Sequence, residues 1–436
     1  MRLTVIALVL ALVAAACSTG EGVPDSTSTT DSGGLVSGML IASEIDRAAP
    51  EAPDADVSIA AAGLIEFATD LYANLAEQDG NLVFSPVSVY VALAMTYAGA
   101  AGSTAEEMAE ILGDELGEEA FHEALNVLDQ ALEARNREST DSEGAVELSV
   151  VNSLWGQDGM TFEQAFLDLL GRDYGAGVRL VDFIDPAARE EARLAINDWV
   201  AGETDDHIEE LVGEGVLDAM VRLVLVNAVY LNAAWMTPFA EDATSDGDFH
   251  LLDGSVTQAP LMNMSAMLRY AHGDGWQAVE LPYAGNELAM LVVVPDEGSF
   301  ADVETALETD LMNAVKAGLE HQQVAISLPK FEIRHQVGLV PALRAMGLTE
   351  ATGSSADFSG MTGGKDLFIS DVLHEAWISA DEAGTEAAAA TAVMMSLTAA
   401  PAEPIELTVD RPFLFVLHDT ETGSILFMGR VVDPST

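Results

Sequence analysis

The stretch DEAGTEAAAATA, residues 381–392, decides how this sequence is interpreted. Its run of alanines favours helix, yet it lies between two strand-like patterns, LHEAWISAD at 373–381 and IELTVDRPFLFVL at 405–417. A linker at this place would contain more Ser, Pro or Gly, and a core helix would carry larger apolar residues at helical spacing. The segment fits neither description, so its small side chains need another explanation.

The composition is globular and strongly acidic. Of the 436 residues, 49% are hydrophobic, and 72 acidic against 17 basic residues give a net charge of -55. Such a surface repels nucleic acid, so no nucleic-acid partner is expected. The acids are spread along the whole chain. This favours a solvated carboxylate coat suited to salty surroundings over a site for cations or for a basic partner.

The first residues have the build of an export signal. Residues 1–17, MRLTVIALVLALVAAAC, contain an apolar run that is too short for a comfortable membrane span. The ending AAAC at 14–17 resembles the bacterial lipoprotein cleavage box. This implies that Cys17 becomes a lipidated first residue, which would anchor the protein at the extracellular face of the membrane. An ordinary signal peptide and a secreted protein remain the alternative. Because Cys17 is the only cysteine, the chain forms no internal disulfide.

Residues 18–56 are rich in Ser, Thr, Gly, Asp and Pro, which is typical of a flexible tether. We expect ordered structure to begin near Val57. Helical patterns come first, at 58–77, after Ser85-Pro86 and at 118–136. Strand patterns then dominate, for example at 145–156, 222–235, 276–283, 288–296, 324–333 and 424–434. Early helices followed by many strands predict an α+β fold with large, mainly antiparallel sheets.

Several separated motifs resemble the serpin family. They include NLVFSPVSVYVALAMTYAGAAGST at 81–104, LVLVNAVYLNAAWMTPF at 223–239, VELPYAGNELAMLVVVPD at 279–296, ISLPKFEI at 326–333 and DRPFLFVLHDTETGSILFMGRVVDP at 410–434. The resemblance implies a single serpin domain at 57–436, with three β-sheets, about nine helices and an exposed reactive-centre loop at about 383–410. It also implies an inhibitor of serine proteases, which is a suicide substrate and not an enzyme.

The resemblance also explains the alanines. When a protease cuts the loop, its upstream part inserts as a new strand into the main sheet, and alternate side chains enter a packed interior. Residues Thr385, Ala387, Ala389 and Thr391 would point one way, and Glu386, Ala388 and Ala390 the other. The inward set must be small and uncharged, and Gly384 supplies backbone freedom. In the uncleaved chain we expect Thr385 to lie near the surface.

Family spacing places the cleaved bond about fifteen residues past the hinge glycine, at Thr398–Ala399. The bonds that follow Leu397 and Met395 remain alternatives. No Lys or Arg occurs between Ala383 and Asp410. The target is therefore expected to be an elastase-, subtilisin- or chymotrypsin-like serine protease and not a trypsin-like one, whose specificity pocket is acidic.

Other residues match supporting positions of the family. Ser85, Ser88, Asn227 and His374 match a polar cluster beneath the point where the sheet opens, although His374 could be a plain core histidine. Lys330 and Glu382 match positions that can pair where the loop enters the sheet, and two solvated charges are the alternative. Trp235 matches an aromatic residue at the same entry, where it could simply pack in the core.

Other functions have weaker support. Ser327 and Lys330 fit the S-x-x-K pattern of penicillin-binding enzymes, but Pro329 disfavours the helix which that chemistry needs. Arg135 and Arg137 lie among acids, so a heparin-like polyanion is not expected. No cofactor or metal is expected, and we expect a monomer. The remaining alternative is a non-inhibitory, serpin-fold surface or binding lipoprotein.

Overall fold

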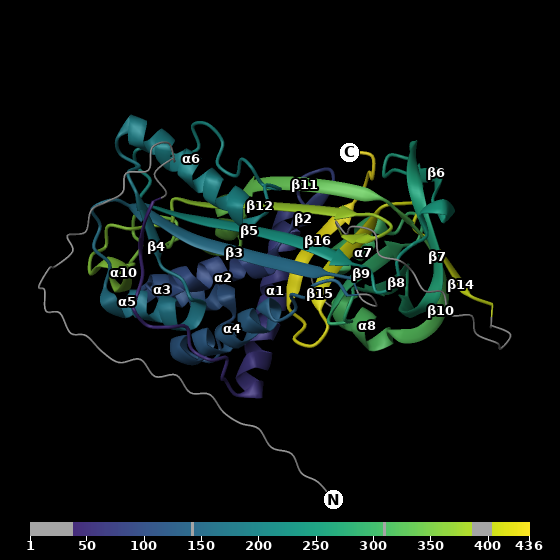
Figure 1. Ribbon diagram of the computed structural model, residues 1–436, viewed down its shortest axis with the longest axis horizontal. Helices are drawn as coiled ribbons and strands as arrows, with labels where there is room; N and C mark the ends of the chain where they lie inside the picture. The colour runs from purple at the N-terminus through teal and green to yellow at the C-terminus, as the bar shows by residue number, and fades with distance from the viewer. Residues whose placement is uncertain (1–37, 141–143, 308–310, 386–402) are drawn as a thin grey trace, which may run out of the picture. The chain divides into compact units, whose positions relative to one another are not determined.

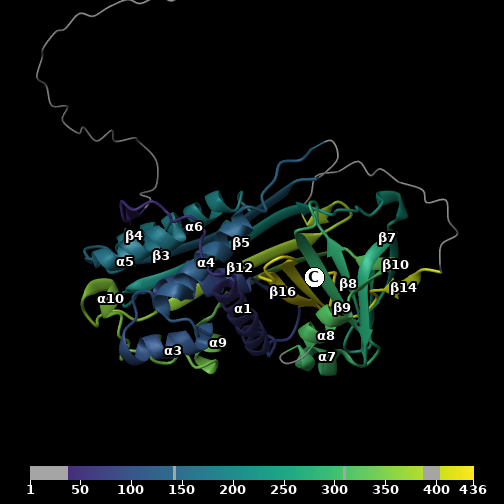
Figure 2. The same cartoon turned by 90° about the horizontal axis from the view of Figure 1, so that it is seen from below.

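A computed structural model of the chain describes residues 38–140, 144–307, 311–385 and 403–436. Cys17, the tether up to residue 37, the hinge residues from Glu386 to Thr391 and all the candidate cleavage bonds lie outside the described residues. Figures 1 and 2 show the described elements in two views.

Ten α-helices occur within the described ranges. They are α1 (Asp54–Leu75), α2 (Pro86–Tyr97), α3 (Gly102–Leu112), α4 (Glu118–Glu133), α5 (Gln164–Leu169), α6 (Pro186–Glu203), α7 (Phe300–Ala306), α8 (Leu311–Gly318), α9 (Val340–Ala345) and α10 (Ser359–Thr362). The helix predicted after Ser85 begins as its sequence indicates. The Ser85 hydroxyl accepts from the N–H of Ser88, and Pro86 occupies the first helical position.

The main sheet has seven strands in the order β1-β4-β3-β5-β13-β12-β11. They are β1 (Met39–Ile41), β4 (Val178–Val181), β3 (Val146–Gln157), β5 (Leu223–Ala234), β13 (Gly384–Thr385), β12 (Asp371–Ala380) and β11 (Phe331–Gly338). Alternate residues of β5 enter two different cores. Leu225, Val229 and Leu231 join the large core that contains α2, whereas Val224, Val226 and Ala228 join a smaller core beneath α6 (Figure 1). Both faces of this sheet are therefore covered.

The second sheet follows the order β14-β10-β7-β8-β9-β15-β16-β2, and β6 pairs with β7. Its strands are β14 (Ile405–Thr408), β10 (Glu320–Pro329), β7 (Val256–Gly273), β8 (Trp276–Pro282), β9 (Leu288–Pro295), β15 (Phe413–Asp419), β16 (Ile425–Val431), β2 (Leu82–Phe84) and β6 (Ser245–His250). One half of the long strand β7 pairs with β6 and the other half with β8. These two halves correspond to the second and third sheets of the expected fold, joined here through β7.

The folded part begins before the expected Val57. Met39–Ile41 form β1, which pairs with the edge strand β4. Arg47 then forms ion pairs with Asp129 and Glu133 on α4. The three-residue strand is too short to show a periodicity, so the sequence offered no sign that residues 38–53 are fixed to the domain. At the other end of the chain, β14 begins at Ile405, inside the range expected for the loop.

Candidate functional site: a strand-insertion site

The expected reactive loop begins inside the main sheet. β12 and β5 are parallel neighbours along part of their length, and the last pair of their register joins Ala376 to Val229. Further along, β13 lies between the two strands, and Thr385 pairs with Ala233 of β5 and with Ala380 of β12. The sheet is therefore closed along one part and forked at one end. The first two strand residues of the loop already fill the end of this fork.

Gly384 lies too close to β5 to carry a side chain. A Cβ atom at this position would lie 2.1 Å from the carbonyl oxygen of Ala233 and 2.8 Å from the Cα atom of Ala234. The carboxylate of Asp381 closes the turn before it, because it accepts from the backbone N–H groups of Ala383 at 2.8 Å and Gly384 at 3.2 Å. Glycine is thus required here for close backbone approach as well as for conformational freedom.

The expectation that Thr385 lies near the surface is wrong. Thr385 is 1% exposed, and its hydroxyl lies 2.6 Å from the hydroxyl of Tyr283. Burial raises the pKa of Tyr283, so the phenol keeps its proton and can donate this bond. The sequence pattern placed Thr385 correctly among inward-facing residues, but the residue turns inward before any cleavage.

Glu382 joins this turn to the corner between β10 and β11 and to the residue that precedes β6. Its carboxylate pairs with Lys330 and accepts a hydrogen bond of 2.6 Å from the hydroxyl of Thr244. Burial alone would raise the pKa of Glu382, but the hydrogen bonds from Lys330 and Thr244 outweigh it and hold this pKa below its usual value. The carboxylate is therefore ionised at neutral pH. The structure brings the two predicted partners together as an ion pair at the fork.

Trp235 holds the same turn from the side of β5. Its indole N–H donates to the carbonyl oxygen of Asp381 at 2.9 Å, and its backbone N–H donates to the carbonyl oxygen of Ala383 at 2.9 Å. Its ring stacks on Tyr283 with centroids 4.5 Å apart. Core packing is thus only part of its role, because both of its N–H groups fix the backbone of the hinge.

A polar group, the junction cluster, lies where β5 and β12 are paired. It consists of the buried Ser85, Ser88, Asn227 and His374 and the half-buried Asn152. The backbone N–H of Ser85 donates to Nε2 of His374 at 3.0 Å, and Nδ1 of His374 is hydrogen-bonded to Oδ1 of Asn227. The hydroxyl of Ser88 donates to Oδ1 of Asn152 at 3.2 Å. Asn152, Asn227 and His374 are register partners on β3, β5 and β12. The cluster therefore links three adjacent strands to the start of α2.

The imidazole of His374 is neutral. Burial lowers the pKa of His374 to about 3, and the nearby His335 adds to this effect. Because Nε2 accepts from Ser85, the ring proton lies on Nδ1 and is donated to Asn227. Both ring nitrogens of His374 thus have a partner, although Nδ2 of Asn227 has none among the described residues, and these two bonds favour one arrangement of the strands. Separation of β5 from β12 must break the bond between His374 and Asn227.

Three members of the site were missed by sequence reasoning. Asn152 is half-buried in the middle of β3, and this position was a usable signal, since an amide withdrawn from water needs partners. Tyr283 and Thr244 gave no signal. Their roles depend on the tertiary approach of the hinge, which brings each of them to a residue more than 100 positions away in the chain.

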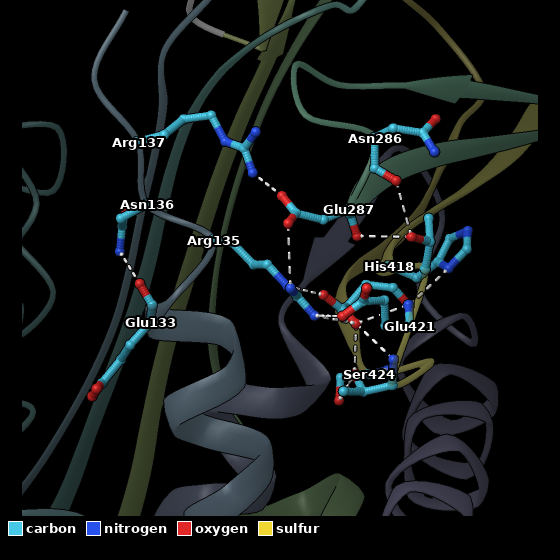
Figure 3. A network of polar contacts seen from close by, with 12 residues as sticks. Glu133, Arg135, Asn136, Arg137, Asn286, Glu287, His418, Glu421 and Ser424 are labelled. Atoms are coloured by element: carbon cyan, nitrogen blue, oxygen red, sulfur yellow. Dashed lines mark hydrogen bonds and ion pairs between the residues drawn. The ribbon is translucent and has the colours of Figure 1, made fainter.

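Arg135 and Arg137 are engaged in a network of ion pairs (Figure 3). Arg135 pairs with the fully buried Asp419 at 2.6 Å and with Glu421 at 2.8 Å. Arg137 pairs with Glu287. These contacts tie the segment after α4 to the start of β9 and to the turn between β15 and β16. The two arginines thus have structural partners within the chain.

The S-x-x-K pattern of Ser327 and Lys330 does not form an active site. Ser327 lies on strand β10 and its hydroxyl is hydrogen-bonded to Asn263, whereas Lys330 pairs with Glu382. No group of three or more metal-binding side chains occurs among the described residues. A search of the same residues finds no helix with the length and apolarity that crossing a membrane would require.

The comparisons with known proteins assign the class to which this fold belongs. The family model described as "Serpin (serine protease inhibitor)" matches residues 62–434, and the chain therefore belongs to the serpin family. It is 38% identical to an uncharacterized serpin-like protein of Thermococcus kodakarensis, over 84% of each chain. It is 33% identical to the human leukocyte elastase inhibitor, over 84% of this chain and 97% of that one.

The solved structures agree with this assignment. The thermophilic serpin tengpin in its native state matches with a TM-score of 0.78 and 26% identity, over 90% of this chain and 97% of tengpin. Uncleaved ovalbumin matches with a TM-score of 0.76 and 24% identity, over 86% of this chain and all of that one, and shows the shared fold alone.

Proposed function

We propose that this protein inhibits serine proteases as a suicide substrate. The observation that carries the proposal is the seating of Gly384 and Thr385 between β5 and β12, which marks the place and register at which a cleaved loop would continue to insert. The protease attacks the loop and forms an acyl-enzyme. The hinge segment then enters the sheet and moves the attached protease before deacylation. The protease supplies the chemistry and this chain supplies the conformational change.

Insertion of the hinge segment is driven by the hydrogen bonds that a new strand forms between β5 and β12. Insertion gives up the six-pair register between Asp371–Ala376 and Val224–Val229 and forms ladders on both sides of the new strand. With a net gain of about 1 kcal/mol for each hydrogen bond, a strand of about a dozen residues gains on the order of 10–20 kcal/mol. This is enough to distort a protein that is covalently attached to the loop.

We place the cleaved bond at Thr398–Ala399, with Leu397 and Met395 as alternative positions for the residue before the cut. The absence of Lys and Arg from the loop sequence favours elastase-, subtilisin- or chymotrypsin-like targets, because a trypsin-like pocket requires a basic residue. The similarity to a protein named as an elastase inhibitor supports the same class of target.

A panel of proteases tests this assignment. Elastase- or subtilisin-type enzymes should lose activity and form an adduct that survives a denaturing gel, whereas trypsin should keep its activity and form no adduct. Intact mass of the adduct and of the released C-terminal fragment gives the cleaved bond. An adduct with trypsin and none with the other enzymes would refute the proposed specificity.

A non-inhibitory role as a surface or binding protein is the second candidate, because the serpin fold alone does not require inhibition. It is less favoured here because the hinge residues are small. Gly384 has no room for a side chain, and the next inward positions after Thr385 are Ala387, Ala389 and Thr391. The uncleaved chain already requires the glycine at 384, but a hinge that never inserted further would not need small side chains at 387, 389 and 391.

We propose that the protein is exported and acts as a monomer, held by a lipid on Cys17 at the extracellular face of the membrane. Replacement of the thiol by a hydroxyl removes the group that is lipidated. Cys17→Ser should therefore release the protein from membranes or block its maturation, which fractionation of the producing cells would measure. Unchanged membrane association of Cys17→Ser would rule out the lipid anchor, and secretion of the unmodified wild type would favour an ordinary signal peptide.

A further inference from the structure

A stack of three aromatic rings lies over the fork between β5 and β12. Tyr230 and Trp377 are the next residues after the last register pair, Val229 with Ala376. The imidazole of His207 lies between their two rings. Its centroid is 4.9 Å from that of Tyr230, with an interplanar angle of 11°, and 4.8 Å from that of Trp377, with an angle of 15°. One residue from outside the sheet thus bridges the two strands at the level where their pairing ends.

The two distances match the geometry of a sheet that has gained a strand. Neighbouring strands lie about 4.8 Å apart, and side chains stand roughly perpendicular to the sheet. With the imidazole between them, the rings of Tyr230 and Trp377 are held about two strand spacings apart. This is the separation that β5 and β12 need when one strand lies between them. At Tyr230 and Trp377, the stack therefore holds β5 and β12 at the separation that they would have with a strand inserted between them.

His207 is held in place by the chain around it. It follows α6 after a turn in which Asp205 and Asp206 adopt φ values of 47° and 63°, a conformation uncommon for residues other than glycine. Its backbone N–H donates to the carbonyl oxygen of Thr204 at 2.8 Å. Its own carbonyl oxygen accepts from Arg334 on β11 at 2.7 Å. A strained turn and a bond to a neighbouring strand fix the imidazole over the fork.

The register of β13 identifies the residue that would arrive beneath this imidazole. Thr385 is the antiparallel partner of Ala233 and of Ala380. If the same register continues, Ala388 lies opposite both Tyr230 and Trp377. In an inserted strand it would be three residues from Thr385, whose side chain faces Tyr283, so the side chain of residue 388 would face the opposite side of the sheet. That is the side on which α6 and His207 lie.

We propose that His207 is a positioning residue for strand insertion. Its ring keeps the fork open at the width of an inserted strand and limits residue 388 to a small side chain. The proposal rests on the proposed function, because it assumes that the hinge inserts between β5 and β12. Without the ring, Tyr230 and Trp377 can move toward each other and the fork narrows, so the incoming strand has to separate them again.

A synthetic peptide of residues 386–398, EAAAATAVMMSLT, tests the proposal without any protease. Its uptake by the full uncleaved chain can be followed by the mass of the complex and by the change in total tryptophan fluorescence, to which Trp377 of the stack contributes. His207→Ala should slow uptake at least about fivefold, as expected from the loss of two aromatic contacts. His207→Phe keeps a flat ring and should stay within about twofold of the wild type, where the loss of contacts is small. Equal rates for His207→Ala and the wild type, faster uptake by His207→Ala, or no uptake by the wild type would overturn the proposal.

A peptide with leucine in place of Ala388 provides the coupling test. It should be taken up much more slowly than the natural peptide by the wild type, and this penalty should shrink in His207→Ala, because the space above residue 388 is then free. An equal penalty in both proteins would contradict the proposed contact. Protease trapping by the wild type, measured separately, reports on the proposed function alone. A chain that traps protease but shows no dependence on His207 rejects only this inference.

Discussion

Thr385→Arg is expected to turn the protein from an inhibitor into a substrate. Thr385 is 1% exposed and bonded to Tyr283 in the uncleaved chain, so an arginine there would place a charge in the core of the sheet. An unpaired buried charge costs several kcal/mol even after relaxation, and arginine keeps its charge under these conditions. The first strand residues should therefore leave the fork, and insertion should be slowed at its first step while deacylation proceeds normally.

The measurement is the number of inhibitor molecules consumed for each protease inactivated. This number is one plus the ratio of the deacylation rate to the insertion rate. A barrier raised by several kcal/mol slows insertion by about a hundredfold or more, so a rise of tenfold or more is expected. Glu386→Arg is the matched control, since it introduces the same side chain one residue later, on the opposite side of the strand, where a charge already occurs. Efficient trapping by Thr385→Arg, or equal loss in both variants, would contradict the inward role of Thr385.

The sequence predicted the central strands well because their apolar runs are long and bounded by turn residues. The strand predicted at 222–235 corresponds to β5 at Leu223–Ala234, and the pattern at 145–156 to β3 at Val146–Gln157. The pattern at 324–333 was read as one strand, but the chain turns at Lys330 and forms β10 and β11. Apolar residues continue on both sides of this corner, so periodicity alone could not place it.

The long strand β7, Val256–Gly273, was not predicted. It contains Pro260, which argues against a strand. Its burial also changes along its length, because it pairs with β6, β10 and β8 in turn. A strand whose two halves serve different parts of a sheet has no single inner face. Its alternation is therefore lost in the sequence although its hydrogen bonding is extensive.

The site was predictable where a resemblance supplied positions, and unpredictable where it depended on approach in space. Ser85, Asn227 and His374 were named from the sequence and lie together in the structure. The burial of Thr385 could not be foreseen, because it follows from the contact with Tyr283. His207 gave no signal either, since its partners Tyr230 and Trp377 come from two other strands.

Cleavage of the loop is expected to raise the thermal stability of the chain by a large amount. In the uncleaved chain, β5 and β12 share one ladder, and β13 contributes only two residues to the fork. An inserted strand replaces that ladder by two longer ones, with a gain on the order of 10–20 kcal/mol. With an unfolding entropy of about 2.1 cal/mol/K per residue, 1 kcal/mol corresponds to roughly 1.3 °C for a domain of this size, so the unfolding midpoint should rise by roughly 13–25 °C.

The thermal unfolding midpoint before and after a single cut in the loop therefore tests strand insertion most directly. The cut is made with a protease that the chain does not trap, mass spectrometry verifies that it lies between residues 392 and 402, and both fragments are kept together. Thr385→Arg, cut in the same way, serves as the control and should show a much smaller rise. The account predicts an increase of about 10 °C or more for the wild type. An unchanged or lower midpoint of the cut wild type would contradict it.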